Sequence, residues 1–158
     1  MNPSERKAAF FARTMHTPDS PERAELRAAL RDSSKILIPL HRHLIDAAKD
    51  EYSVVHGPVE KPAHLLQLLT DDPFFAWLKP VTSLIVDIDE MARIDFESEA
   101  AFAIGDRLRD LFGHQGVASR FAEQYVPILQ RDVDVAIGHA ALQKAMTPLV
   151  RPNAAKSE

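Results

Sequence analysis

Apolar residues recur every three or four positions along most of the chain, and this spacing predicts helices. The clearest stripe runs from residue 74 to residue 91 and comprises Phe74, Trp77, Leu78, Val81, Leu84, Ile85, Ile88 and Met91. A second stripe runs from residue 121 to residue 141 and comprises Phe121, Tyr125, Ile128, Leu129, Val133, Ile137, Ala140 and Ala141. No segment alternates apolar and polar residues before a hairpin turn, so the pattern predicts an all-α fold.

Capping residues, prolines and glycines indicate where these helices begin and end. The sequence predicts helices at about 2–13, 20–56, 62–70, 72–91, 98–113 and 117–146. The short connections favour an up-and-down bundle of about four main helices, with short N-terminal and connecting helices. We therefore divide the chain into an N-terminal helical arm at 1–18, a helical bundle at 19–148 and a mobile C-terminal tail at 149–158.

Three prolines, Pro39, Pro80 and Pro127, lie inside apolar runs that otherwise predict continuous helix. A proline inside a helix removes one backbone hydrogen bond and clashes with the preceding turn, at a cost of about 3 kcal/mol. We expect the three helices to bend at these prolines, because each apolar stripe continues on the far side. Whether a helix bends or breaks there is left open by the sequence.

Composition narrows the classes of function. The chain has 158 residues, which suggests one domain with a sizeable core. It contains no cysteine, which excludes disulfides, thiolate metal sites and a thiol nucleophile. The formal net charge of -4 provides no basic field for phosphates, so we expect no nucleic-acid partner. No run of 18 apolar residues and no signal peptide occurs, so we expect a cytoplasmic protein that does not enter a membrane.

Seven histidines are the first candidates for metal binding or proton transfer. Two ligands on one helix need a spacing of three or four residues, but no HxxxH, HExxH or ExxH motif occurs. The sequence therefore assigns no metal ligands and no cofactor. His41 shares a helix face with Leu37 and Leu44, so we expect it to be partly buried. Its simplest interpretation is an imidazole bonded to a carbonyl or a carboxylate near Pro39.

Acidic residues cluster at 87–90 and at 132–134, and Asp87 and Asp132 flank the apolar stripes of their segments. Two carboxylates that face each other inside a bundle could hold a metal ion or share a proton. The simpler interpretation is a solvated face whose acids pair with arginines such as Arg93 and Arg131.

Basic residues also recur every four positions on one helix face, as Arg23, Arg27, Arg31 and Lys35. Acidic neighbours match them, so we expect a solvated face, with an acidic partner as the alternative. The aromatic residues Phe74, Phe75 and Trp77 could line an apolar pocket, but such a stripe is more often core. No nucleophile motif and no glycine-rich phosphate loop is present.

Three hypotheses about function remain. The first is a non-catalytic interaction module that forms a homodimer or binds a protein partner, with Phe10 and Phe11 of the N-terminal arm as a contact. The second is a bundle that binds a small apolar ligand or a metal in its interior, through His41, Trp77, Asp87, Tyr125 and His139. The third is an acid–base enzyme that uses His41 and an aspartate. We favour the first hypothesis, because no motif commits the chain to a chemistry.

Overall fold

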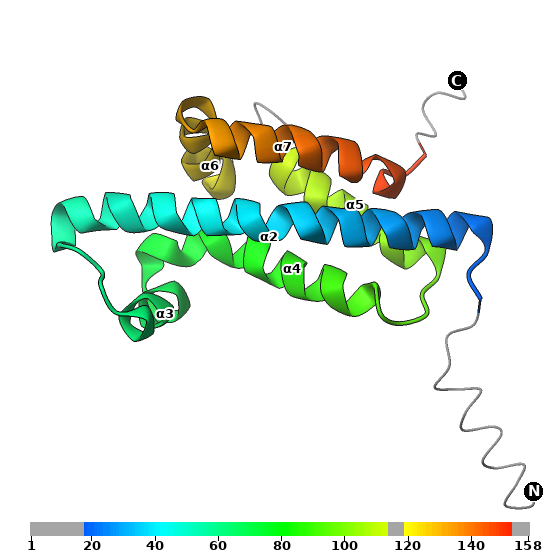
Figure 1. Cartoon of the computed structure of the whole chain (residues 1–158), viewed down its shortest axis with the longest axis horizontal. Helices are drawn as coiled ribbons and strands as arrows, with labels where there is room; N and C mark the ends of the chain where they lie inside the picture. The colour runs from blue at the N-terminus through cyan, green and yellow to red at the C-terminus, as the bar shows by residue number, and fades with distance from the viewer. Residues whose placement is uncertain (1–17, 114–118, 153–158) are drawn as a thin grey trace, which may run out of the picture.

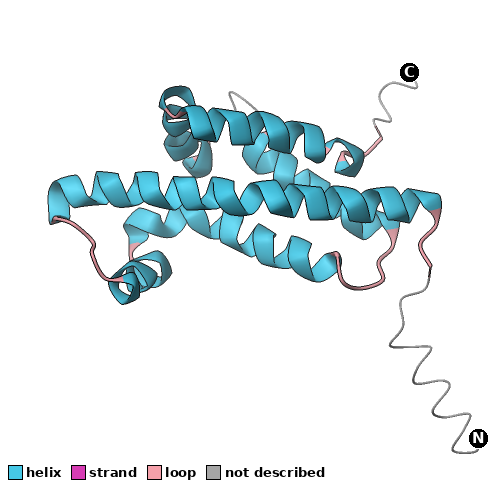
Figure 2. Cartoon of the chain, in the orientation of Figure 1, coloured by secondary structure: helices cyan, strands magenta, loops and turns pink. Residues whose placement is uncertain are grey.

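The computed structural model describes residues 18–113 and 119–152. Within these ranges the chain forms six α-helices, two short 3₁₀-helices and no strand (Figure 2), so the predicted all-α class is confirmed. The elements in chain order are α2 (Pro21–His56), α3 (Pro62–Asp71), η1 (Pro73–Leu78), α4 (Lys79–Met91), α5 (Ser98–Phe112), α6 (Arg120–Arg131), α7 (Val133–Ala145) and η2 (Thr147–Leu149). The helix predicted at 2–13, and with it all but the last residue of the predicted arm, lies outside the described residues.

The long helix α2 is the centre of the fold. Helices α4 and α7 pack along it, and in Figure 1 they lie on opposite sides of it and run in the opposite direction. Helix α5 packs against both α2 and α4. The expected arrangement of four main helices in up-and-down order is not confirmed. Instead, several shorter helices pack against one helix of 36 residues, α2.

The helix starts follow local capping chemistry. The Ser20 hydroxyl accepts a hydrogen bond from the backbone N–H of Arg23 at 3.1 Å, which begins α2 as predicted. The Asp72 carboxylate accepts one from the N–H of Phe74 at 2.8 Å and begins η1. At the other end of α2, Gly57 has a φ of 84°, a value that glycine adopts without strain, and the helix stops there.

The prolines behave in two different ways. Helix α2 continues through Pro39, and α6 continues through Pro127. Both prolines are exposed, so the carbonyl that each one leaves without a helical partner lies on the solvent side of its helix. The expected bend at Pro80 within one long helix is wrong, because the α-helix begins only at Lys79. Pro80 is therefore the second residue of α4, a position where no N–H is required.

The 3₁₀ geometry of η1 also changes which aromatic residue is buried. A 3₁₀-helix has three residues per turn, so Phe75 and Leu78 share one face. Phe75 is completely buried, whereas Phe74, which the predicted stripe placed in the core, is 36% exposed. The start of the predicted stripe is therefore shifted by one residue.

The last predicted helix is in fact two helices. The chain is extended at Asp132, with φ of -111° and ψ of 114°, and its carboxylate accepts a hydrogen bond from the N–H of Val135 to cap α7. The break lies at Asp132 and not at Pro127. Helix α7 packs against α2 and α6 and buries Val135 and Leu142, whereas Val133 and Ile137 of the predicted apolar face are 72% and 64% exposed.

The packed structure extends past the predicted bundle boundary at residue 148. Leu149 in η2 is completely buried, and Arg151 forms ion pairs with Glu99 and Asp106. A Cβ atom at Gly105 would overlap the carbonyl oxygen of Leu149, so the absence of a side chain at this position lets η2 pack directly on α5. The remainder of the predicted tail, residues 153–158, lies outside the described residues.

Candidate functional site

The five candidate residues fall into three groups with different partners. His41 lies on α2 and contacts α4, and Asp87 lies on α4 and contacts α5. Trp77, Tyr125 and His139 belong to a third group, which gathers where η1, α6 and α7 meet. The single interior site expected from the sequence is therefore divided.

The third group is a packed aromatic cluster with one polar end. The ring centroid of Phe121 is 5.8 Å from that of Trp77 and 5.0 Å from that of Tyr125. The Tyr125 hydroxyl lies 2.7 Å from Nδ1 of His139. The Gln143 amide nitrogen donates to the carbonyl of Phe112 at 2.6 Å and lies 3.5 Å from Nε2 of the same imidazole. Burial raises the pKa of Tyr125 and lowers the pKa of His139, so both groups stay neutral near pH 7.

This cluster leaves almost no empty space. The cavity beside Tyr125 and His139 has a volume of about 10 Å³, which is at the lower limit for a single water molecule. A ligand cannot occupy this position without moving α6 or α7. The hydrogen bond between the two side chains therefore has a structural role in the described conformation.

The acidic candidates are paired or used as caps. The Asp87 carboxylate accepts a hydrogen bond from Nη1 of Arg107 at 2.7 Å, and Asp89 pairs with Arg93. Asp132 caps α7. Among the described residues no three histidine, aspartate or glutamate side chains lie close enough together to hold a metal ion.

His41 is partly buried, as predicted, but its partner is neither a carbonyl nor a carboxylate. Its Nε2 lies 3.1 Å from the Thr82 hydroxyl on α4, and that hydroxyl is also 3.3 Å from the carbonyl of Leu78. Burial lowers the pKa of His41. Thr82 is the hydrogen-bond partner of His41, and Asp87, the aspartate among the candidate residues, is bonded to Arg107.

Arg27 corrects the prediction of a solvated basic face. It is only 8% exposed, and its Nε and Nη2 donate to the carboxylate of Asp19 at 2.7 and 3.1 Å. Its Nη1 donates to the carbonyls of Ala92 at 2.8 Å and Ile94 at 2.9 Å, and its guanidinium lies 4.8 Å from the ring centroid of Phe96. The hydrogen bond to Asp19 is the main cause of its raised pKa. Arg27 therefore joins the start of α2 to the turn that follows α4.

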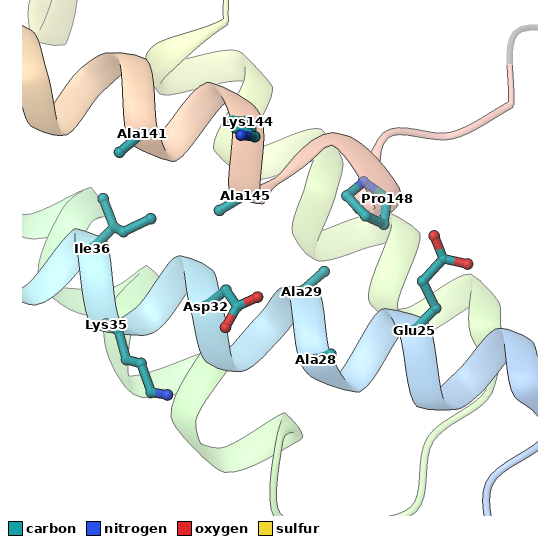
Figure 3. Close-up of a pocket in the computed structure, with 10 residues that line it drawn as sticks. All are labelled: Glu25, Ala28, Ala29, Asp32, Lys35, Ile36, Ala141, Lys144, Ala145 and Pro148. Carbon is teal, nitrogen blue, oxygen red and sulfur yellow. The ribbon is translucent and has the colours of Figure 1, made fainter.

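A surface groove between α2 and α7 was not predicted from the sequence. We call it the α2–α7 groove; its volume is about 600 Å³, and Figure 3 shows the residues that line it. The apolar side chains that line it are Ala28, Ala29, Ile36, Ala141, Ala145 and Pro148, and the charged ones are Glu25, Asp32, Lys35 and Lys144. The only sequence signal was the cluster of alanines on the two helices.

The apolar surface of α7 continues beyond this groove. Val133, Ile137 and Ala141 follow one another at intervals of four residues, which places them in one row along the helix. Val133 and Ile137 are among the most exposed large apolar side chains in the described part of the chain. Ala141 belongs to both the row and the groove, so the row leads from the groove towards the start of α7.

Comparison of the chain with protein-family models, with curated proteins and with solved structures found no match. None of the helices in the described ranges combines the length and the apolar character needed to cross a membrane.

Proposed function

We propose that this protein is a non-catalytic interaction module that forms a two-fold symmetric homodimer through the α2–α7 groove and the apolar row of α7. The observation that carries the proposal is the open groove of about 600 Å³, which shares Ala141 with the row that contains the exposed side chains of Val133 and Ile137. Exposed apolar surface of this kind is typical of protein–protein contacts.

The shape of the groove favours a helix as its occupant. Small side chains such as Ala141 and Ala145 allow a second helix to approach closely, because the distance between packed helices depends on the side chains at the contact. The row of Val133 and Ile137 is a ridge of the kind that fits such a groove. In a two-fold dimer each copy supplies one ridge and one groove, so both apolar surfaces are covered.

One antiparallel register of α7 against α7 of the second copy satisfies the apolar and the charged positions together. If the two-fold axis passes near residue 139, Val133 of one copy lies opposite Ala145 of the other, and Ile137 lies opposite Ala141. The same register places Asp134 opposite Lys144. Opposite charges at matching positions favour this pairing over other registers.

The oligomeric state of the full chain tests the proposal. Light scattering should give twice the 17.6 kDa mass of one chain, and Ile137→Glu should give a monomer at the same concentration. Val86→Glu is the matched control, because Val86 is 58% exposed but lies on α4, on the other side of α2. A wild-type chain that stays monomeric at 100 µM, a concentration at which even interfaces of about micromolar Kd are largely formed, would exclude the dimer.

A charge exchange tests the register. Asp134→Lys alone and Lys144→Asp alone should each weaken the dimer, because each places like charges opposite one another. The double variant should restore it, whereas a contact elsewhere on the molecule would show no such rescue.

Deletion of residues 1–18 tests the alternative contact, predicted from the sequence, through the N-terminal arm. Loss of the dimer in that variant would assign the contact to the N-terminal segment instead.

A further inference from the structure

A second cavity lies where α2, α3, η1 and α4 meet, away from the α2–α7 groove. Its volume is about 490 Å³, within the range of small-molecule sites. Leu66 and Leu69 of α3 and Leu78 of η1 provide apolar walls, while His41 comes from α2. The cavity therefore combines a large apolar surface with a polar group from another helix.

Helix α3 forms the outer wall and is lightly attached. Leu68 is its buried residue, and Leu65 and Leu69 are half-buried. Leu66 is 66% exposed although it lines the cavity. A ligand with an apolar body would cover part of this leucine surface and would hold α3 more firmly against the bundle.

The polar groups of the cavity favour an anion. Lys79 and Thr82 of α4 line it together with His41. Among the described residues that line the cavity none carries a carboxylate, and the charged residue is Lys79. The Thr82 hydroxyl already lies 3.1 Å from Nε2 of His41 and 3.3 Å from the carbonyl of Leu78, so the lysine ammonium is the donor that an acid group would meet here.

We propose that this cavity binds a small monocarboxylate with an apolar chain or ring. The leucines of α3 and η1 contact the apolar body, and Lys79 binds the carboxylate beside the hydrogen-bonded pair of His41 and Thr82. This site is separate from the proposed dimer contact, because the two cavities share no lining residue, although α2 contributes residues to both.

Titration calorimetry of the full chain with decanoate, decanol and decylamine tests the proposal. Decanoate should bind with one site per chain, and decanol and decylamine should bind at least fivefold more weakly. Equal binding of decanol would show that the acid group is not recognised and would overturn the carboxylate assignment. Absence of saturable decanoate binding up to 1 mM, the weak limit for a specific small ligand, would overturn the site.

Variants locate the binding. Lys79→Gln should weaken decanoate binding at least fivefold, whereas Lys61→Gln, an exposed lysine just before α3, should change it less than twofold. Leu66→Asn should weaken it and remove the slower amide hydrogen exchange that we expect in residues 62–71 of the complex. If Ile137→Glu abolishes binding instead, the ligand occupies the α2–α7 surface and the proposal is wrong.

Discussion

The hydroxyl of Tyr125 lies 2.7 Å from Nδ1 of His139, and this hydrogen bond connects α6 to α7 across the corner at Asp132. Tyr125 is 2% exposed, and its ring stacks on Phe121 with the ring centroids 5.0 Å apart. The contact fixes the angle between two helices that the sequence presents as one. It therefore also fixes the direction of α7 along α2, and with it the position of the α7 residues that line the α2–α7 groove.

Tyr125→Phe should lower the free energy of unfolding by about 1 to 3 kcal/mol, because it leaves Nδ1 of a half-buried imidazole without its partner. Urea unfolding followed by circular dichroism measures the change. Tyr52→Phe is the matched control, since the described contacts of Tyr52 are made by its ring, with His56, Phe74 and Phe75. Equal losses in the two variants would show that the hydroxyl of Tyr125 has no special role.

Stability should fall in mildly acidic solution. Burial lowers the pKa of both His41 and His139 below the ordinary value of 6.5. The unfolded chain therefore binds protons more readily, and the contribution of these two groups is complete above pH 6.5 and is lost as the pH falls through their pKa values in the folded protein. Urea unfolding between pH 7.5 and pH 5 should show this loss, and His139→Gln should make the dependence on pH less steep. An unchanged slope in His139→Gln would contradict the assignment.

Arg27→Ala should be strongly destabilising, by about 3 kcal/mol, because it removes a buried guanidinium that donates to Asp19 and to the carbonyls of Ala92 and Ile94. Arg31→Ala on the next turn of α2 is the control, since Arg31 is exposed and its replacement should change stability by less than about 0.5 kcal/mol. Thermal and urea unfolding of the two variants measure the loss of stability on removing a buried, hydrogen-bonded arginine and on removing a solvated one.

We expect replacement of the three prolines by alanine to change the stability of the protein in opposite directions. Pro39→Ala should stabilise the protein by about 1 to 3 kcal/mol, because it restores a helical hydrogen bond on an exposed face of α2. Pro127→Ala in α6 should act in the same direction. Pro80→Ala should instead cost about 0.4 to 1 kcal/mol, because Pro80 already fits the first turn of α4 and stiffens the unfolded chain. A gain from Pro80→Ala would contradict the observed start of α4.

Local chemistry explains which parts of the fold were predictable. Two helix starts depend on capping side chains that accept a hydrogen bond from a backbone N–H only two or three residues further along the chain. These are Ser20 at the start of α2 and Asp72 at the start of η1. The break at Asp132 was missed because the apolar spacing continues through it and an aspartate can occupy either a helix or a cap. The burial of Phe75 in place of Phe74 was missed because the pattern assumes 3.6 residues per turn, and η1 has three.

The candidate sites depend on contacts between distant residues, and these were not predictable. Arg27 is buried by carbonyls 65 and 67 positions away, so its spacing on α2 gave no sign of its role. His41 was recognised as a polar group on an apolar helix face, and Tyr125 as a member of the second apolar stripe. Their separation into different groups follows from the corner between α6 and α7, which the spacing of apolar residues did not indicate.

The central position of α2 also matters while the chain is being made. Helix α2 ends at His56, and α7, which covers one of its sides, ends only at Ala145. At ordinary rates of translation the ribosome needs on the order of ten seconds to add the intervening residues. During that interval the apolar face of the nascent α2 that α7 later buries stays exposed to solvent, and exposed apolar surface of this kind is what chaperones bind.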